Sequence, residues 1–298
     1  MARHRLSTAL QRAAAALNDV SDTPRLDAEL LAAHELGVGR MTMLSRMPDL
    51  QEPPGFAQLI ARRLADEPVA YITGCQPFWD IDLRVSPGVL IPRSDSETLI
   101  ETAQSHFAAT SPPRRILDLG TGSGALLLAA LSLYHDAYGA GVDASMAALE
   151  IACENAQRLQ LGSRCTFAAV NWRDDGWADQ VNALHNGAPA LFDLILCNPP
   201  YIRQGTQLSA MVDQYEPHEA LYAELDGLDN YRRIIPQIPQ LLSPHGIACF
   251  EIGFDQADAV QQLGAIAGFE TALLHDLSGQ PRCITLRHGA CGQKSRKT

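Results

Sequence analysis

From about Ser94 onward the chain alternates strand-like and helical segments, and this alternation constrains the fold more than any other feature of the sequence. The strand-like segments are RRILDLG, AYGAGVDAS, CTFAAVN, FDLILCNPP, GIACFEIG, TALLHDL and RCITLRH. Helical segments separate the first six of them, which predicts an α/β fold with a doubly wound, mostly parallel seven-stranded sheet. Only a short link joins the last two strands, so one of them should run antiparallel.

The residues before this region follow a different pattern. Four apolar residues recur at helical spacing near the N-terminus: Leu6, Leu10, Ala13 and Leu17. A second periodic segment covers residues 24–36, and two shorter ones follow. The segment FWDIDLRVSPGVLIPR then alternates and ends near a proline, which is typical of a short hairpin. We therefore predict a small helical domain over residues 1–72, a β-hairpin linker over 73–93 and the α/β domain over 94–298.

The segment ILDLGTGSGAL places three glycines between the first strand of the sheet and the helix after it. A turn of this kind lets a ligand approach backbone N–H groups at the start of a helix, which is typical of nucleotide-type sites. Asp143 ends the next strand, 23 residues after Gly120. An acidic side chain at that place can accept hydrogen bonds from both hydroxyls of a ribose. An alternative role for Asp143 is to cap the helix that follows it.

Two cofactors fit this turn. A nicotinamide dinucleotide fits the spacing GxGxxA, with Ala125 in the last position, whereas S-adenosylmethionine fits an acid, one residue and GxGxG, from Asp118 to Gly124. The second fits better, because the Asp118 carboxylate can help to hold the methionine ammonium, directly or through water, and a dinucleotide has no such group. After the third strand, Trp172 could flank the adenine ring, with core packing as the alternative, and Asn171 could hydrogen bond to the adenine edge.

The fourth strand ends in the segment NPPY, from Asn198 to Tyr201, which should lie at the carboxyl edge of the sheet beside the first strand. A planar amide nitrogen is a poor nucleophile, because its lone pair is delocalised. If the Asn198 side-chain oxygen and the Pro199 carbonyl each accept a hydrogen bond from the substrate amide nitrogen, the lone pair of this nitrogen is directed at a sulfonium methyl. Pro200 adds rigidity, and Tyr201 can stack on the flat substrate group. We therefore predict these four residues to be catalytic.

The composition argues against several classes of function. The net charge of -11 disfavours binding to nucleic acid or an anionic membrane through a broad basic surface. The seven cysteines show no CxxC pair and no metal-ligand spacing, so we predict no metal site, no disulfide framework and a reducing, cytoplasmic compartment. Cys197 has no evident His partner and should be a buried strand residue and no nucleophile. No apolar stretch approaches the roughly 20 residues that span a bilayer.

Eight segments carry, in order, a resemblance that covers nearly the whole chain: DAELLAAHELG, EPVAYITG, VSPGVLIPR, ILDLGTGSGALLLA, NPPYI, YEPHEAL, DGLDNYRRI and FEIGFDQ. With them the chain resembles the protein-(glutamine-N5) methyltransferases of the HemK family, in particular the peptide chain release factor glutamine methyltransferases. The resemblance implies an N-terminal helical domain for substrate recognition, a hairpin linker and a Rossmann-like, S-adenosylmethionine-dependent methyltransferase domain.

The same resemblance implies roles for individual residues. Those that would bind S-adenosylmethionine are Gly120, Thr121, Gly122, Ser123, Gly124, Asp143, Trp172 and Asn198. The segment from Asn198 to Tyr201 would hold the substrate, the glutamine of the GGQ loop in class-I peptide chain release factors. We expect a cytoplasmic monomer that binds no membrane and makes no direct contact with nucleic acid.

Four alternatives remain open. Ser94 stands where the release-factor enzymes usually have proline, which favours the sister enzymes acting on a large-subunit ribosomal protein; Asn171 and the pair Ala223–Glu224 also depart from the usual pattern. An adenine-N6 DNA methyltransferase solves the same chemical problem, but this chain is acidic and has no basic target-recognition insertion. A dinucleotide-dependent oxidoreductase leaves NPPY unexplained, and a non-catalytic binding module leaves the intact motif set unexplained.

Overall fold

The computed structural model describes residues 5–184, 191–224 and 226–289, which form two compact units. The first unit contains the described residues of Met1–Cys75 together with Leu208–Tyr215. The second contains those of Gln76–Gln207 and Glu216–Thr298. The sequence pattern did not predict that Leu208–Tyr215 would join the N-terminal residues. Within the first unit, the Tyr215 hydroxyl donates a hydrogen bond of 2.8 Å to the Ala65 carbonyl.

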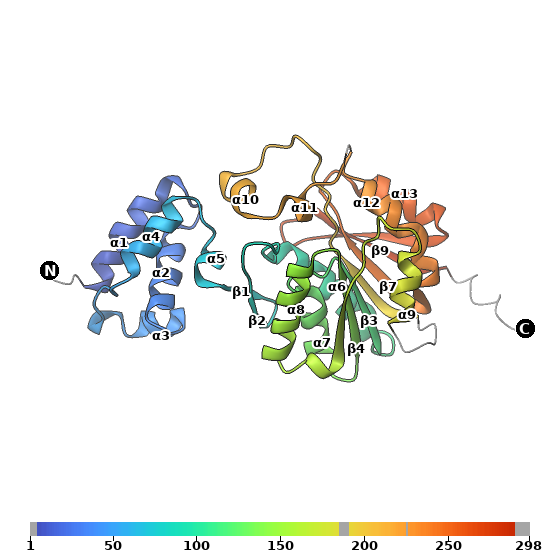
Figure 1. Ribbon diagram of the computed structural model, residues 1–298, viewed down its shortest axis with the longest axis horizontal. Helices are drawn as coiled ribbons and strands as arrows, with labels where there is room; N and C mark the ends of the chain where they lie inside the picture. Colours follow the sequence, from blue (N-terminus) through green and yellow to red (C-terminus); the bar gives the residue numbers. More distant parts are fainter. Residues whose placement is uncertain (1–4, 185–190, 225, 290–298) are drawn as a thin grey trace, which may run out of the picture. The chain divides into compact units, whose positions relative to one another are not determined.

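The first unit is helical (Figure 1). Its helices are α1 (Leu6–Ala16), α2 (Pro24–Glu35), α3 (Arg40–Ser45), α4 (Phe56–Leu64), α5 (Val69–Thr73) and α10 (Ala210–Tyr215). The helical spacing predicted for α1 is confirmed, because Leu6, Leu10 and Leu17 are fully buried. A buried ion pair between Arg63 and Asp27, at 2.9 Å, joins α4 to α2.

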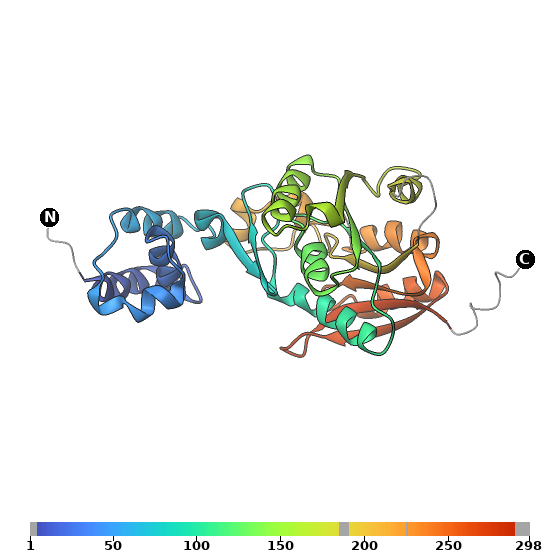
Figure 2. The ribbon, with the colours of Figure 1, turned by 90° about the horizontal axis from the view of Figure 1, so that it is seen from below.

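The second unit contains two sheets. Strands β1 (Cys75–Phe78) and β2 (Ile81–Arg84) pair in a small sheet at the place of the predicted hairpin. The large sheet has the order β5-β4-β3-β6-β7-β9-β8. Its strands are β3 (Arg115–Leu119), β4 (Tyr138–Asp143), β5 (Cys165–Ala169), β6 (Phe192–Cys197), β7 (Leu242–Glu251), β8 (Phe269–His275) and β9 (Pro281–His288). Strand β9 runs antiparallel to both neighbours, as predicted from the short link, and β8 and β9 lie together at one edge of the sheet (Figure 2).

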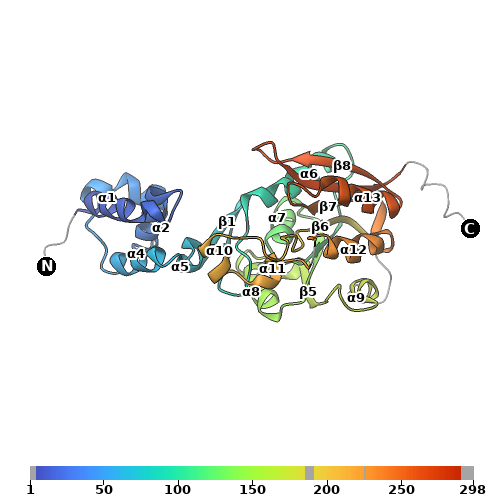
Figure 3. The same cartoon turned by 90° about the horizontal axis from the view of Figure 1, so that it is seen from above.

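Helices cover both faces of the large sheet (Figure 3). One face packs against α6 (Glu97–Ala108), α7 (Ala125–Leu133) and α8 (Met146–Arg158), and the other against α9 (Trp177–Ala183), α12 (Asp229–Ile234) and α13 (Ala257–Ile266). The short helix α11 (His218–Leu221) lies in the connection between β6 and β7. Because side chains alternate along a strand, Ile116 packs with the α7 side and Leu117 with the α9 side. The predicted doubly wound, mostly parallel seven-stranded fold is confirmed.

The strand order brings two of the sequence motifs together. Strand β6 pairs with β3 in parallel, with Leu119 opposite Cys197, so that the glycine turn after β3 and the NPPY segment after β6 start side by side. From β3 the strand order continues through β4 to β5 on one side and through β6 to β7 on the other side. The boundary between β3 and β6 is thus a topological switch point, the usual place for a ligand in an open α/β sheet.

Candidate functional site

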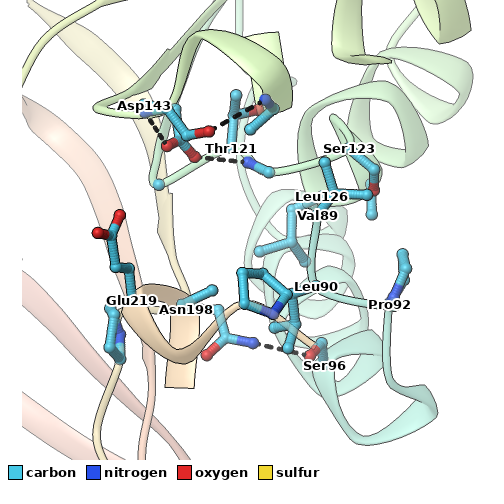
Figure 4. Close-up of a pocket in the computed structure, with 18 of the residues that line it drawn as sticks. Val89, Leu90, Pro92, Ser96, Thr121, Ser123, Leu126, Asp143, Asn198 and Glu219 are labelled. Carbon is cyan, nitrogen blue, oxygen red and sulfur yellow. Dashed lines mark hydrogen bonds between the residues drawn. The ribbon is translucent and has the colours of Figure 1, made fainter. Parts of the chain in front are cut away.

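A pocket lies at this carboxyl edge, entirely within the second unit, and we call it the edge pocket (Figure 4). Its walls come from the glycine turn, the end of β4, the NPPY segment and two further segments, residues 88–96 and 217–220. Of the residues predicted to bind a cofactor or substrate, those that line it are Gly120, Thr121, Gly122, Ser123, Asp143, Trp172, Asn198 and Pro200. The pocket is therefore built from segments that are far apart in the sequence.

The glycine turn has the backbone that its three glycines allow. Gly120, Gly122 and Gly124 have φ of 75°, 54° and 84°, in the left-handed region that residues with a Cβ rarely adopt. A Cβ added to Gly120 would lie 3.0 Å from the Trp172 ring, so this turn and that ring are in close contact. Gly124 is the residue before α7, which places the backbone N–H groups of the turn at the start of a helix.

Asp143 joins the end of β4 to the glycine turn. Its Oδ2 accepts a hydrogen bond from the Gly122 N–H at 2.9 Å, and its Oδ1 accepts one from the Ser145 N–H at 2.9 Å (Figure 4). The alternative role as a helix cap is wrong, because Ser145 is the N-cap of α8 and its hydroxyl accepts from Ala148. Burial raises the Asp143 pKa, and hydrogen bonds from backbone N–H groups offset part of this rise. A carboxylate has about four acceptor sites, so acceptor capacity remains for a ribose hydroxyl.

Asp118 supports the turn from inside the sheet and does not line the edge pocket. Its Oδ2 accepts hydrogen bonds from the Thr121 hydroxyl at 2.7 Å and from the Leu127 N–H at 3.3 Å. Its Oδ1 is buried and has no hydrogen-bond partner among the described residues. Burial raises the pKa of this carboxyl to about 7. A cationic group near the turn would stabilise its ionised form.

The NPPY segment is held by side chains from four other segments. Asn198 Nδ2 donates to the Ser96 hydroxyl at 3.1 Å, so its oxygen is turned away from Ser96 (Figure 4). The Pro200 carbonyl accepts from Asn230 Nδ2 at 2.8 Å. At Tyr201, the carbonyl accepts from the Gln256 side chain at 3.1 Å, and the hydroxyl donates to the Glu251 carboxylate at 3.1 Å. The turn is therefore fixed at both ends by buried polar groups.

Burial raises the pKa of three groups in or beside this turn. Glu251 is 1% exposed, and burial raises its pKa above the usual value. Burial and the nearby Glu251 raise the pKa of Tyr201, so its hydroxyl stays protonated and can donate. Cys197 is fully buried at the end of β6, and burial raises the pKa of its thiol well above the usual value. The predicted buried strand position of Cys197 is confirmed.

Trp172 and Asn171 take different positions after β5. The Trp172 ring borders the edge pocket, and its Nε1 donates to Asn230 Oδ1 at 2.9 Å. Asn171 borders a second hollow, shared with Trp172, Pro200 and Asn230, and its Oδ1 accepts from the Arg173 N–H at 2.9 Å. Its Nδ2 group is then left to reach a ligand, together with the second lone pair of Oδ1.

Two opposite walls of the edge pocket are joined by Glu216, whose side chain is fully buried. Its carboxylate accepts a hydrogen bond from the Ile91 N–H at 3.2 Å and pairs with the Arg93 guanidinium. Ile91 and Arg93 belong to the wall of residues 88–96, and Glu216 immediately precedes the wall of residues 217–220. Sequence reasoning assigned no role to Glu216. Its segment, YEPHEAL, contributed only to the family resemblance.

Within residues 5–184, 191–224 and 226–289, no group of three or more His, Cys, Asp or Glu side chains could hold a metal ion. In the same part of the chain, every helix is too short or too polar to cross a membrane.

Comparison with known proteins identifies the class. Residues 8–74 match the family of PrmC N-terminal domains, and residues 111–263 match a methyltransferase domain family. The chain is 38% identical over 279 residues to a release factor glutamine methyltransferase from Rhodospirillum rubrum, a match that covers 91% of this chain and 81% of that protein. A protein of the same name from Bordetella pertussis is 40% identical over 266 residues, with 87% and 93% covered. One from Corynebacterium glutamicum is 36% identical over 294 residues, with 95% and 98% covered.

The doubly wound sheet, the edge pocket and the matched domain define this chain as a methyltransferase with a Rossmann-like fold. The similarity to these relatives extends over most of both chains. The chain therefore belongs to the release factor glutamine methyltransferase family.

Proposed function

We propose that this chain transfers a methyl group from S-adenosylmethionine to the side-chain amide nitrogen, N5, of the glutamine in the GGQ loop of class-I peptide chain release factors. The observation that supports the proposal is that the glycine turn and the NPPY segment start side by side, and that residues of both line the edge pocket. The names of the relatives support the release factor as the substrate.

The groups around the edge pocket match the parts of S-adenosylmethionine that need partners. The left-handed glycine turn exposes backbone near Trp172, Asp143 keeps acceptor capacity for a ribose hydroxyl, and Asp118 supplies a buried carboxylate with one unpartnered oxygen beneath the turn. The cofactor supplies an electrophilic sulfonium methyl when it is bound. In this proposal the residues that hold it are Asp118, Gly120, Thr121, Gly122, Ser123, Gly124, Asp143, Asn171, Trp172 and Asn198.

The NPPY segment would orient and activate the substrate amide. Because Asn198 Nδ2 is engaged with Ser96, the Asn198 oxygen is the group left to accept a substrate N–H, and the Pro199 carbonyl would accept the other. Two such bonds hold the nitrogen lone pair toward the methyl donor and favour the pyramidal geometry of the transition state. Pro200 stiffens the turn, and Tyr201 would stack on the flat amide while Glu251 holds its hydroxyl. The methylated nitrogen then releases one proton to water.

We assign the parts of the chain as follows. Residues 1–72 recognise the protein substrate, residues 73–93 link the two parts and also contribute to a wall of the edge pocket, and residues 94–298, apart from Leu208–Tyr215, perform the chemistry. The enzyme acts in the cytoplasm as a monomer and makes no direct contact with nucleic acid. These assignments agree with the net charge of -11 and with the match of residues 8–74 to a separate domain family.

The test is methyl transfer from tritiated S-adenosylmethionine by the purified chain. A class-I release factor, the same factor with its GGQ glutamine changed to alanine, a large-subunit ribosomal protein preparation and adenine-containing DNA are offered separately. We expect label on the unaltered release factor alone, with mass spectrometry locating one added methyl on the GGQ glutamine. Label on the ribosomal protein or on DNA in place of the release factor would contradict the proposal.

A further inference from the structure

Asn230 lies behind the edge pocket and is bonded to two of its walls. It is the second residue of α12 and is 2% exposed. Its Oδ1 accepts the Trp172 indole N–H at 2.9 Å, and its Nδ2 donates to the Pro200 carbonyl at 2.8 Å. Trp172 and Pro200 both border the edge pocket. One buried amide thus bonds to the ring beside the glycine turn and to the NPPY turn.

The chemistry of the three groups allows one arrangement only. An indole N–H can only donate, and a proline carbonyl can only accept. A side-chain amide offers an acceptor oxygen for the indole and a donor nitrogen for the carbonyl. Exchanging the positions of the Asn230 oxygen and nitrogen would break both hydrogen bonds. The orientation of this amide is therefore fixed by its partners, and each partner is fixed by the amide.

The helix that carries Asn230 is firmly anchored. Tyr231, the next residue, is fully buried, and its hydroxyl donates to the Glu251 carbonyl at 2.7 Å. Ile234, on the same helix, is fully buried in the core cluster against the sheet. Groups mounted on packed helices hold their partners more exactly than groups on loops. Asn230 thus connects two loop segments to a rigid part of the fold.

We propose that Asn230 is a positioning residue, which holds the Trp172 ring and the Pro200 end of the NPPY turn at a fixed separation. The inference rests on the proposed function, because it deepens the account of how that site aligns its two substrates. Asn230 touches neither substrate. It acts through Trp172 on the cofactor side and through Pro200 on the side of the substrate amide, and a misplacement of about 1 Å between reacting groups can lower a rate roughly 100-fold.

Two substitutions separate the two bonds. Asn230→Asp is nearly equal in size and keeps an acceptor for Trp172, but it loses the donor to Pro200 when its carboxylate is ionised, so its rate is followed as the pH is raised. We expect turnover in single-turnover methyl transfer to fall about 10-fold to 100-fold, while the KM for the release factor and the Kd for the cofactor stay within about threefold, since those contacts are not touched. Asn230→Leu removes both bonds, so it should lower turnover at least as far and also weaken cofactor binding.

The fluorescence of Trp172 gives a reading that does not depend on turnover. Trp172→Phe identifies the part of the emission that comes from this residue, and Asn230→Leu should shift that part, because the indole N–H loses its partner. Asn230→Asp should leave it near the parent. Ile238→Val is the matched control: it removes one buried methyl group from the core cluster that also contains Ile234 and leaves the bonds of Trp172, Pro200 and Tyr231 in place, so it should lower the melting temperature and keep turnover within about threefold.

A turnover of Asn230→Leu within threefold of the parent would overturn the inference, and so would a loss of turnover in Ile238→Val as large as that in Asn230→Leu. If the parent methylates no release factor, the proposed function fails. The Asn230→Leu measurements then test only whether Asn230 positions the Trp172 ring. Unchanged Trp172 emission together with unchanged cofactor affinity would refute that part of the inference.

Discussion

The contact between the glycine turn and the Trp172 ring can be tested with a matched pair of substitutions. Gly120 and Gly122 both have left-handed φ, at 75° and 54°. A Cβ on Gly120 would lie 3.0 Å and 3.3 Å from two atoms of the Trp172 ring, whereas a Cβ on Gly122 would have no atom within 4 Å. Gly122→Ala therefore introduces backbone strain alone, and Gly120→Ala introduces similar strain plus a steric contact.

The expected magnitudes follow from this difference. An alanine in the left-handed region costs about 1 to 2 kcal/mol. Overpacking against a side chain that cannot move freely adds about 1 to 3 kcal/mol, and the bond from Trp172 to Asn230 restricts that ring. We therefore expect the free energy of unfolding to fall by about 1 to 2 kcal/mol in Gly122→Ala and by about 2 to 5 kcal/mol in Gly120→Ala.

The assay is urea unfolding without cofactor, followed by circular dichroism, so that no ligand contact contributes. Asn230→Ala frees the Trp172 ring, so the double variant Gly120→Ala/Asn230→Ala should lose less stability than the sum of the two single changes. Equal destabilisation by Gly120→Ala and Gly122→Ala, or full additivity in the double variant, would refute the close contact that we infer between the turn and the ring.

Three further predictions concern the polar groups of the site. Asp143→Ala should weaken S-adenosylmethionine binding by about 1.5 to 3 kcal/mol in calorimetric titration, and Asp143→Asn, which keeps one acceptor, should lose less; an unchanged affinity would remove Asp143 from the ribose contact. Asp118 has a folded-state pKa of about 7 against a usual 3.8, so its protonated form favours folding, and this stability is lost as the pH rises toward 7. Between pH 5 and pH 8 the free energy of unfolding of the parent should therefore fall by about 2 to 3 kcal/mol more than that of Asp118→Asn; parallel pH profiles would contradict this. Asn198→Ala should lower single-turnover methyl transfer about 100-fold to 1,000-fold, with release-factor affinity nearly unchanged; a rate within about threefold of the parent would exclude the amide clamp.

The sequence predicted the parts of the fold that obey short-range rules. Alternating strands and helices have few allowed topologies, so the position of Asn198 beside the glycine turn followed from chain order alone. The short helix α5 was not predicted, and the bounds of α10 and α12 within the predicted helical connection were not given, because five or six residues are too few to display a helical period. The alternative role of Asp143 as a helix cap was wrong because Ser145, two residues later, has the better geometry for that cap.

The supporting residues of the site escaped prediction for a different reason. Ser96 lies 102 positions from Asn198, and Asn230 lies 58 positions from Trp172. No local pattern connects such pairs, and the contact of Asn230 also depends on how the connection between β6 and β7 folds. Glu251 and Asn230 each occur in segments that carried the family resemblance, DGLDNYRRI and FEIGFDQ, but the resemblance named no role for them.

The hydrogen bonds around the NPPY segment leave acceptors at its near end, and acceptors suit an amide substrate. Asn230 and Gln256 donate to the carbonyls of Pro200 and Tyr201, which satisfies the acceptors at the far end of the turn. Asn198 gives its donor to Ser96, which leaves its oxygen available. The near end of the turn therefore offers acceptors. A primary amide has two N–H groups to donate, whereas a carboxylate has none and would be repelled. The protein's own contacts thus favour glutamine over glutamate before any part of the partner is considered.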